Sequence, residues 1–127
     1  MFINQEMLDK EDIYPYMNGR YVFKFAVQKF PEAIVEACET AGYTADDIDM
    51  LIPHQANLRI AQMIQLGLKI TNDRVYNNIQ KYGNTTAASI PIALCEAWEK
   101  GLVKDGDLVC LAAFGSGFTW GAALIRW

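Results

Sequence analysis

His54 and Asn84 are the side chains of this 127-residue chain whose types and surroundings best suit catalysis. His54 is the only histidine, and it lies between a short apolar run that predicts a strand and a helical pattern. Asn84 follows Gly83 in a second loop that opens another helix. The carboxyl ends of strands in open α/β sheets carry ligand sites. An imidazole N–H and an amide N–H can donate to one oxygen, which predicts stabilisation of negative charge that develops on a carbonyl oxygen.

Both residues also have a simpler interpretation. A histidine is common in structural and exposed positions, so its presence alone does not indicate catalysis. An asparagine after glycine is often only a left-handed turn residue. The residue types taken by themselves leave these alternatives open.

The helices that must position the pair follow from apolar periodicity. From residue 23 to residue 41 the spacing predicts a helix, which Pro31 kinks or divides into two and Gly42 ends. A short helix after His54 is expected to end near Gly67, and another covers residues 86–100. The residues expected on the inner face of this last helix are Ile90, Leu94, Ala97 and Trp98.

The strands are expected at residues 49–53, 107–114 and 118–126, with a brief additional strand at 74–79. Only three residues, 115–117, separate the last two long strands, so these must form an antiparallel hairpin. Strand, helix, strand, helix and hairpin predict an α/β fold. We expect layered α/β/α packing around a mixed, mostly parallel sheet with an antiparallel last strand.

Composition and charge exclude several classes of protein. The net charge of -4 argues against nucleic-acid binding, which needs a basic surface. No segment is as long and apolar as a membrane span, and the first residues do not look like a secretion signal, so we expect a cytoplasmic protein without membrane contact. Residues 1–15 are polar and acidic, typical of a linker or the truncated edge of a longer protein, and residues 16–127 are expected to form one domain.

The three cysteines, Cys38, Cys95 and Cys110, offer neither a metal site nor a nucleophile. They have no Cys-x-x-Cys spacing, and there is no second histidine to complete a metal site. Two lie in apolar helical stripes and one in a strand, which favours three small buried hydrophobic residues. We therefore expect no metal and no catalytic cysteine in this chain.

Three motifs together resemble the C-terminal half of β-ketoacyl-acyl-carrier-protein synthase III. They are His-Gln-Ala-Asn-Leu-Arg-Ile at residues 54–60, Gly-Asn-Thr-Thr-Ala-Ala-Ser at 83–89 and the terminal Phe-Gly-Ser-Gly-Phe-Thr-Trp-Gly-Ala-Ala-Leu-Ile-Arg-Trp at 114–127. The resemblance runs from about residue 16 to residue 127. It implies a thiolase-like half-fold, and the N-terminal half of that family is absent from this chain.

The resemblance also implies roles for individual residues. His54 and Asn84 would donate to the carbonyl of a malonyl thioester, and the backbone amide of Ser116 would lie in the oxyanion hole of an acyl-cysteine intermediate. A substrate-binding segment for coenzyme A or the pantetheine of the carrier protein would comprise Gln55, Ala56, Asn57, Leu58 and Arg59, with Gly19 and Phe23 at the tunnel rim. Many relatives have two lysines where this chain has Leu66 and Gly67, so one basic feature that could attract an acidic carrier protein is missing here.

By this resemblance, the full-length enzyme would be a fatty-acid synthesis acyltransferase that condenses acyl-CoA with malonyl-acyl-carrier-protein. Its expected partners are acyl-CoA, acyl carrier protein, its own N-terminal half and a second copy in a homodimer. We expect no cofactor, because the coenzyme A and carrier-protein thioesters are substrates. The chain alone is expected to be inactive, since the nucleophilic cysteine lies in the absent half. Two alternatives remain: a related condensing enzyme that makes a polyketide or quinolone precursor, and a non-catalytic module that binds coenzyme A or carrier protein.

Overall fold

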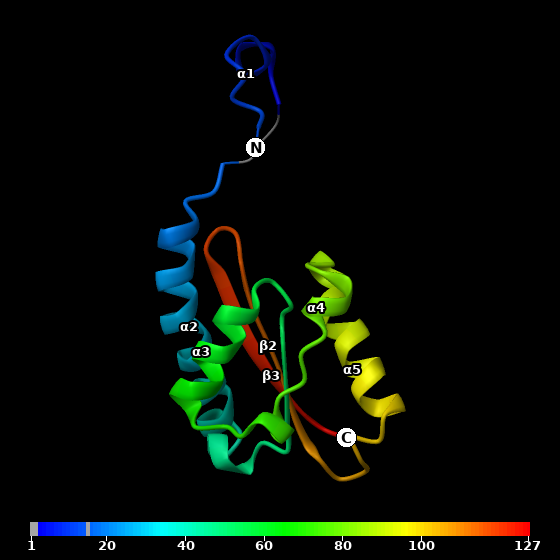
Figure 1. The fold of residues 1–127 in the computed structure, drawn as a ribbon. Coiled ribbons are helices and arrows are strands. Elements are labelled where there is room, and N and C mark those ends of the chain that lie inside the picture. The colour runs from blue at the N-terminus through cyan, green and yellow to red at the C-terminus, as the bar shows by residue number, and fades with distance from the viewer. Residues whose placement is uncertain (1–2, 15) are drawn as a thin grey trace.

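The computed structural model of this chain describes residues 3–14 and 16–127. A three-stranded sheet lies between two layers of helices, with α2 and α3 on one side and α4 and α5 on the other (Figure 1). Within the described residues, no helix is long and apolar enough to cross a membrane. The layered α/β/α arrangement is the one that the sequence predicts.

The sheet has the order β1-β2-β3, with bounds Met50–Pro53, Leu108–Gly115 and Thr119–Arg126. β1 pairs with β2 in parallel, and β2 pairs with β3 in antiparallel register from Leu108 opposite Arg126 to Gly115 opposite Thr119. The mixed sheet and its antiparallel last strand are confirmed. The prediction of a strand at residues 74–79 is wrong, since only an isolated bridge joins Val75 to Leu51 there.

β1 and β2 divide their side chains between two separate cores, whereas β3 packs only Ala122 and Leu124, against the core formed with α2 and α3. Leu51 faces the core formed with α2 and α3, whereas its neighbours Met50 and Ile52 face the core formed with α5. Alternation of this kind follows from the two-residue period of a strand. β1 is apolar throughout and buried at every residue, and His54 follows directly at its carboxyl end.

α2 (Gly19–Thr40) is one continuous helix that contains Pro31, so the expectation of two consecutive helices is wrong. Proline in a helix removes one hydrogen bond and costs about 3 kcal/mol. Phe30 and Ile34 flank it and are both buried against the sheet, which offsets that cost. The predicted end of the helix is confirmed: Gly42 has a φ of 77°, and Tyr43 N–H donates to the carbonyl of Cys38 over 2.8 Å.

α3 (Leu58–Leu68), α4 (Ile79–Tyr82) and α5 (Ser89–Glu99) flank two loops, residues 54–57 and 83–88, which carry His54 and Asn84 and are called the site loops below. α3 ends one residue after Gly67, and the left-handed residue that ends it is Lys69, with a φ of 56°. α5 begins later than predicted, because residues 86–88 form a 3-10 turn. Gly101, with a φ of 69°, follows the end of α5 as expected.

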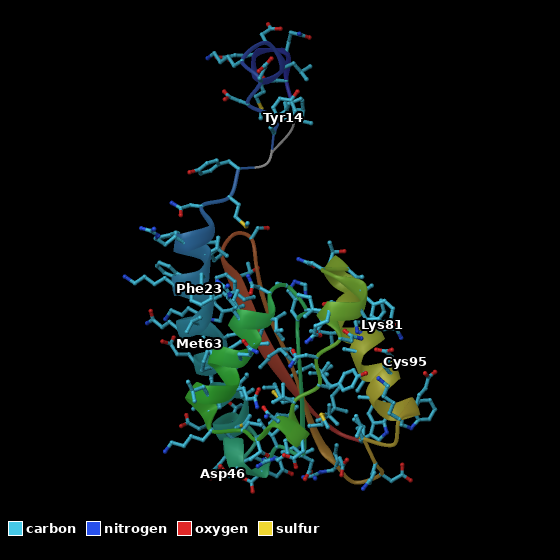
Figure 2. All side chains as sticks on the ribbon, viewed as in Figure 1. Tyr14, Phe23, Asp46, Met63, Lys81 and Cys95 are labelled. Carbon is cyan, nitrogen blue, oxygen red and sulfur yellow. The ribbon has the colours of Figure 1, made fainter. Side chains whose placement is uncertain are left out.

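The inner face of α5 was predicted incorrectly at Trp98 and correctly at Ala97. Trp98 is 55% exposed and lies against Trp127, whereas Ala93 and Ala97 are fully buried. Cys95 is exposed on α5 (Figure 2), where its thiol contacts the Glu99 carboxylate, although Cys38 and Cys110 are buried as expected. Ala93 and Ala97 lie in the core between α5 and the sheet, and the predicted inner residues Ile90 and Leu94 pack against that core.

The N-terminal segment lies apart from the sheet (Figure 1). α1 (Gln5–Asp9) buries none of its residues. Of the segment predicted to be a linker or truncated edge, residues 1, 2 and 15 lie outside the described residues. The boundary predicted at residue 16 stays a prediction.

Candidate active site

His54 lies at the end of β1, where its backbone N–H donates to the carbonyl of Ala112 over 2.8 Å and so continues the pairing of β1 with β2. This bond fixes the position of the histidine relative to the sheet. The ring is partly buried, and burial lowers the pKa of His54 below its ordinary value of 6.5. A neutral imidazole at pH 7 has one nitrogen that donates and one that accepts.

Asn84 is held by a turn of its own. Gly83, which precedes it, has a φ of 69° and ψ of -159°, a conformation that glycine alone adopts easily. The side-chain oxygen of Asn84 accepts a hydrogen bond from the backbone N–H of Thr86 over 2.9 Å. This bond occupies the oxygen and leaves the amide nitrogen, the donor, to face the neighbouring space.

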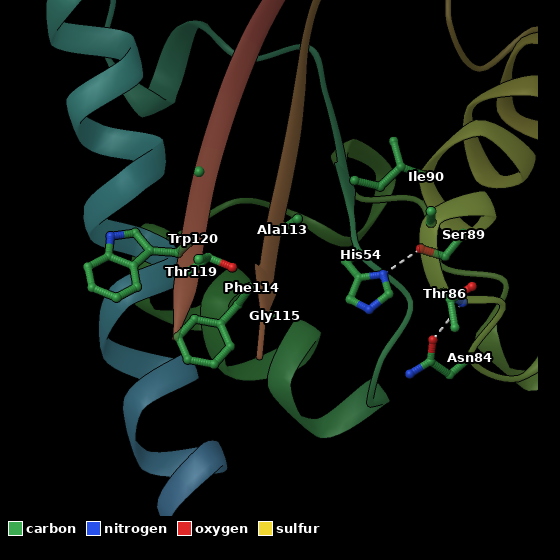
Figure 3. Close-up of a pocket in the computed structure, with 12 residues that line it drawn as sticks. His54, Asn84, Thr86, Ser89, Ile90, Ala113, Phe114, Gly115, Thr119 and Trp120 are labelled. Carbon is green, nitrogen blue, oxygen red and sulfur yellow. Dashed lines mark hydrogen bonds between the residues drawn. The ribbon is translucent and has the colours of Figure 1, made fainter. Parts of the chain in front are cut away.

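One side-chain nitrogen of each residue faces the same cavity. Nε2 of His54 and the amide nitrogen of Asn84 both point into the space between the site loops and the β2–β3 hairpin (Figure 3). The cavity has a volume of about 530 Å³. Its other lining residues, from the second site loop, α5 and the hairpin, are Thr86, Ala87, Ser89, Ile90, Ala113, Phe114, Gly115, Thr119, Trp120 and Gly121.

Such an arrangement can stabilise an anion. Two N–H donors that converge beside an apolar wall bind a developing oxyanion more strongly than water does, because they are already oriented and poorly screened. Phe114 is 7% exposed and supplies part of that wall. A carbonyl oxygen placed between His54 and Asn84 would therefore be polarised toward an enolate.

Gln55 is not where the sequence interpretation placed it. Its side chain is 2% exposed and cannot present itself to coenzyme A or a carrier protein. The side-chain oxygen instead accepts hydrogen bonds from the backbone N–H groups of Asn78 (3.0 Å) and Ile79 (3.1 Å), and the amide nitrogen donates to the carbonyl of Pro53 (2.7 Å). Gln55 thus supports both site loops from inside.

The rest of the predicted binding segment lies at the start of α3. Ala56, Asn57 and Arg59 are exposed and Leu58 is partly exposed. Asn57 caps the helix by accepting the backbone N–H of Arg59 over 2.9 Å. Within residues 3–14 and 16–127, the Arg59 guanidinium forms no ion pair. This placement leaves it accessible to an anionic ligand.

Three predicted site residues lie away from the cavity. Ser116 is exposed in the turn between β2 and β3 and does not line the cavity, although its neighbour Gly115 does. Gly19 is the first residue of α2, and Phe23 lies one turn further along and packs against the core. Their proposed roles stay predictions.

Ser89, to which the sequence interpretation assigned no role, lies within hydrogen-bond distance of His54. A small polar residue at a buried position of an apolar helix is the signal that could have pointed to it. Ser89 is thus a third polar side chain of the site. Among the described residues, no group of three or more His, Cys, Asp or Glu side chains is arranged to hold a metal ion.

Comparison with known proteins agrees with this geometry. A family model for the C-terminal part of 3-oxoacyl-[acyl-carrier-protein (ACP)] synthase III matches residues 38–127. The beta-ketoacyl-[acyl-carrier-protein] synthase III of Caldanaerobacter subterraneus subsp. tengcongensis is 54% identical over 112 residues, which are 88% of this chain and 34% of the relative.

Solved structures give the same result. The synthase III from Thermus thermophilus has a TM-score of 0.86 and 51% identity, over 88% of this chain and 35% of that one. The 3-oxoacyl-[acyl-carrier-protein] synthase III from Aquifex aeolicus has a TM-score of 0.87 and 50% identity, over 90% of this chain and 37% of that one. The chain therefore has the thiolase-like half-fold and spans about a third of the length of these relatives.

Because the family model covers most of the chain and about half of the aligned residues are identical in these relatives, the chain belongs to the 3-oxoacyl-[acyl-carrier-protein] synthase III family, as its C-terminal domain.

Proposed function

We propose that this chain supplies the decarboxylation donors of a condensing enzyme that joins an acyl group to a malonyl thioester. The convergence of His54 Nε2 and the Asn84 amide nitrogen on one cavity is the observation that carries the proposal. The Asn84 amide nitrogen is a neutral donor, and His54 Nε2 is one when it carries the ring proton, so the pair suits the oxygen of a thioester carbonyl.

The reaction needs an electron sink at that oxygen. When the bond between the malonyl carboxylate and its α-carbon breaks, carbon dioxide leaves and the electron pair forms an enolate. Its negative charge develops on the thioester oxygen, where His54 and Asn84 would donate. The α-carbon then attacks the carbonyl of an acyl thioester, a new carbon–carbon bond forms and a thiolate leaves.

The nucleophile that carries the acyl group must come from another part of the protein. Burial raises the pKa of the Cys38 thiol, and raises that of Cys110 to about 12. The charge of Glu99 raises the pKa of Cys95. All three thiols are therefore poor sources of a thiolate at neutral pH. The chain alone is expected to be inactive in condensation.

The substrates and partners follow from the same proposal. Acyl-CoA and malonyl-acyl-carrier-protein would be the substrates of the complete cytoplasmic enzyme, a homodimer that initiates fatty-acid synthesis without a resident cofactor. Arg59 is permanently charged and exposed beside the site loop, which suits the phosphate of coenzyme A or an acidic carrier helix. The N-terminal half of the enzyme would supply the cysteine.

A hybrid synthase tests the proposal. This chain would replace the matching third of the Thermus thermophilus enzyme, and release of carbon dioxide from malonyl-carrier and formation of the condensed product would be measured. We expect both activities in the hybrid and no condensation by the purified chain. Condensation by the chain alone would contradict the proposal, and a folded hybrid that binds thioesters without turnover would favour a binding module.

A further inference from the structure

Ser89 is a buried hydroxyl in direct contact with the candidate catalytic histidine. It is the first residue of α5, and 1% of it is exposed. Its Oγ lies 2.5 Å from Nδ1 of His54 (Figure 3). The contact joins the end of β1 to the start of α5 across 35 residues of sequence. It involves the ring nitrogen that faces away from the cavity.

The hydrogen atoms in this contact can be assigned by counting donors and acceptors. The backbone N–H of Gln55 donates to Ser89 Oγ over 3.3 Å, because an amide N–H can only donate. The hydroxyl keeps one proton to give. Among residues 3–14 and 16–127, His54 Nδ1 is the only acceptor within hydrogen-bond distance of that proton.

The opposite assignment leaves a buried group unpaired. If Nδ1 carried a proton, Ser89 Oγ would accept from both Nδ1 and Gln55, and its own proton would have no partner among the described residues, on a side chain that is 1% exposed. Burial also lowers the pKa of His54, which disfavours the doubly protonated ring. Both observations favour an unprotonated Nδ1.

We propose that Ser89 is a positioning residue that donates its hydroxyl proton to His54 Nδ1 and thereby holds the ring in the Nε2–H tautomer. This inference rests on the proposed function, in which Nε2–H is the group that donates to the thioester oxygen. In the other tautomer Nε2 would present a lone pair to that oxygen, and the donor would be lost. Ser89 therefore determines whether His54 can act with Asn84.

Ser89 is not itself a nucleophile. A serine beside a histidine resembles a hydrolase pair, but the hydroxyl of such a pair must reach the substrate carbonyl. Ser89 is 1% exposed, and its oxygen already accepts the Gln55 N–H. The geometry suits orientation of the ring and not attack on a thioester.

Nitrogen NMR of the full chain tests the proposal directly. Because the chain has one histidine, long-range ¹H–¹⁵N spectra of the labelled protein report a single imidazole ring and distinguish its tautomers. The variants are Ser89→Ala, which removes the donor, and Ser89→Thr, which keeps a hydroxyl. The control is Thr71→Ala, which removes an exposed hydroxyl just before residues 72–74. Circular dichroism checks that each variant is folded.

We expect a pure Nε2–H tautomer in the unmodified chain, in Ser89→Thr and in the control. In Ser89→Ala, the Nδ1 resonance shifts and the Nδ1–H form appears. A proton on Nδ1 in the unmodified chain would overturn the proposal without any variant, and an unchanged nitrogen spectrum in folded Ser89→Ala would do the same. The spectrum needs no turnover, so this result is separate from the success or failure of the hybrid synthase.

Discussion

The side-chain oxygen of Gln55 lies 3.0 Å from the backbone nitrogen of Asn78 and accepts its hydrogen bond. This contact links the loop that carries His54 to the start of α4, the short helix that leads to Asn84. The two candidate catalytic residues are far apart in the sequence, and the buried side-chain amide of Gln55 links the segments that carry them. The distance between the two donors therefore depends on a residue that does not line the cavity.

Gln55→Leu is expected to destabilise the chain by about 1–3 kcal/mol, because it leaves buried N–H and C=O groups without partners. The groups concerned are the N–H groups of Asn78 and Ile79 and the carbonyl of Pro53. In the hybrid synthase, decarboxylation should fall as well, since α4 loses its anchor. Urea unfolding measures the first effect and carbon dioxide release the second.

Gln62→Ala is the matched control for this change, because Gln62 is an exposed amide on α3. It should alter stability by less than about 0.5 kcal/mol. Equal stability of the Gln55→Leu variant and the unmodified chain would show that the buried hydrogen bonds of Gln55 contribute nothing.

Gly83→Ala is expected to cost about 1–3 kcal/mol, because alanine is strained at a φ of 69° and ψ of -159°. A Cβ at this position would meet no atom within 4 Å, so the cost comes from the backbone alone. Relief of the strain would rotate Asn84 away from the cavity. The temperature of thermal unfolding should fall, and the rate of decarboxylation by the hybrid synthase should fall as well.

Gly67→Ala is the control for Gly83→Ala, and it is expected to change stability in the opposite direction. Gly67 lies inside α3, and a Cβ there also meets nothing within 4 Å. Alanine should stabilise this helix by about 0.5–1 kcal/mol. If the two substitutions changed stability alike, the conformation of Gly83 would not be the reason for its cost.

Glu96 should make the stability of the chain depend on pH in the acidic range. Its carboxylate accepts from Lys81 (2.8 Å), Asn78 (2.8 Å), Tyr82 (2.9 Å) and Tyr76 (3.3 Å). The Lys81 ammonium, followed by the Asn78 amide, lowers the pKa of Glu96 from 4.5 to about 2. A lowered carboxyl pKa stabilises the fold fully above 4.5, and this contribution is lost as the pH falls toward 2.

Urea unfolding of Glu96→Gln across this pH range checks the expectation. The difference in free energy of unfolding between the unmodified chain and the variant should be largest above pH 4.5 and shrink steadily below it. Glu99→Gln, on the same helix but outside the network, is the control. A difference that did not change with pH would contradict the role of the Glu96 charge.

His54 should titrate below its ordinary pKa of 6.5, because burial disfavours the charged ring. The folded state then binds its proton less readily than the unfolded chain does, so this group favours folding above 6.5 and opposes it as the pH falls below that value. An NMR titration of the single histidine measures the midpoint directly. A midpoint at or above 6.5 would contradict the burial argument.

Much of the fold was predictable from local sequence. Apolar runs and glycines indicated β1, the hairpin and the ends of α2 and α5, because these signals act within a few residues. The positions of His54 and Asn84 followed from loops that flank such elements. Errors arose where packing decides: Trp98 lies outside the core, whereas Ala93 on the same helix is buried in it.

The support of the site was not predictable in this way. Gln55 contacts Asn78 across 23 residues of sequence, and Ser89 contacts His54 across 35. No propensity or period encodes a hydrogen bond between segments so far apart. The motif around Gln55 suggested a ligand-facing residue, and only its burial showed that it positions the loops.

The most direct measurement compares the two half-reactions in His54→Ala and Asn84→Ala variants of the hybrid synthase. Each variant should lose about 10²–10³-fold in malonyl-carrier decarboxylation, as expected for removal of one oxyanion donor, and keep acyl transfer to the cysteine. Gln80→Ala, an exposed amide on α4, should keep both. Full decarboxylation by either variant at His54 or Asn84 would contradict the claim that these two donors form the decarboxylation site.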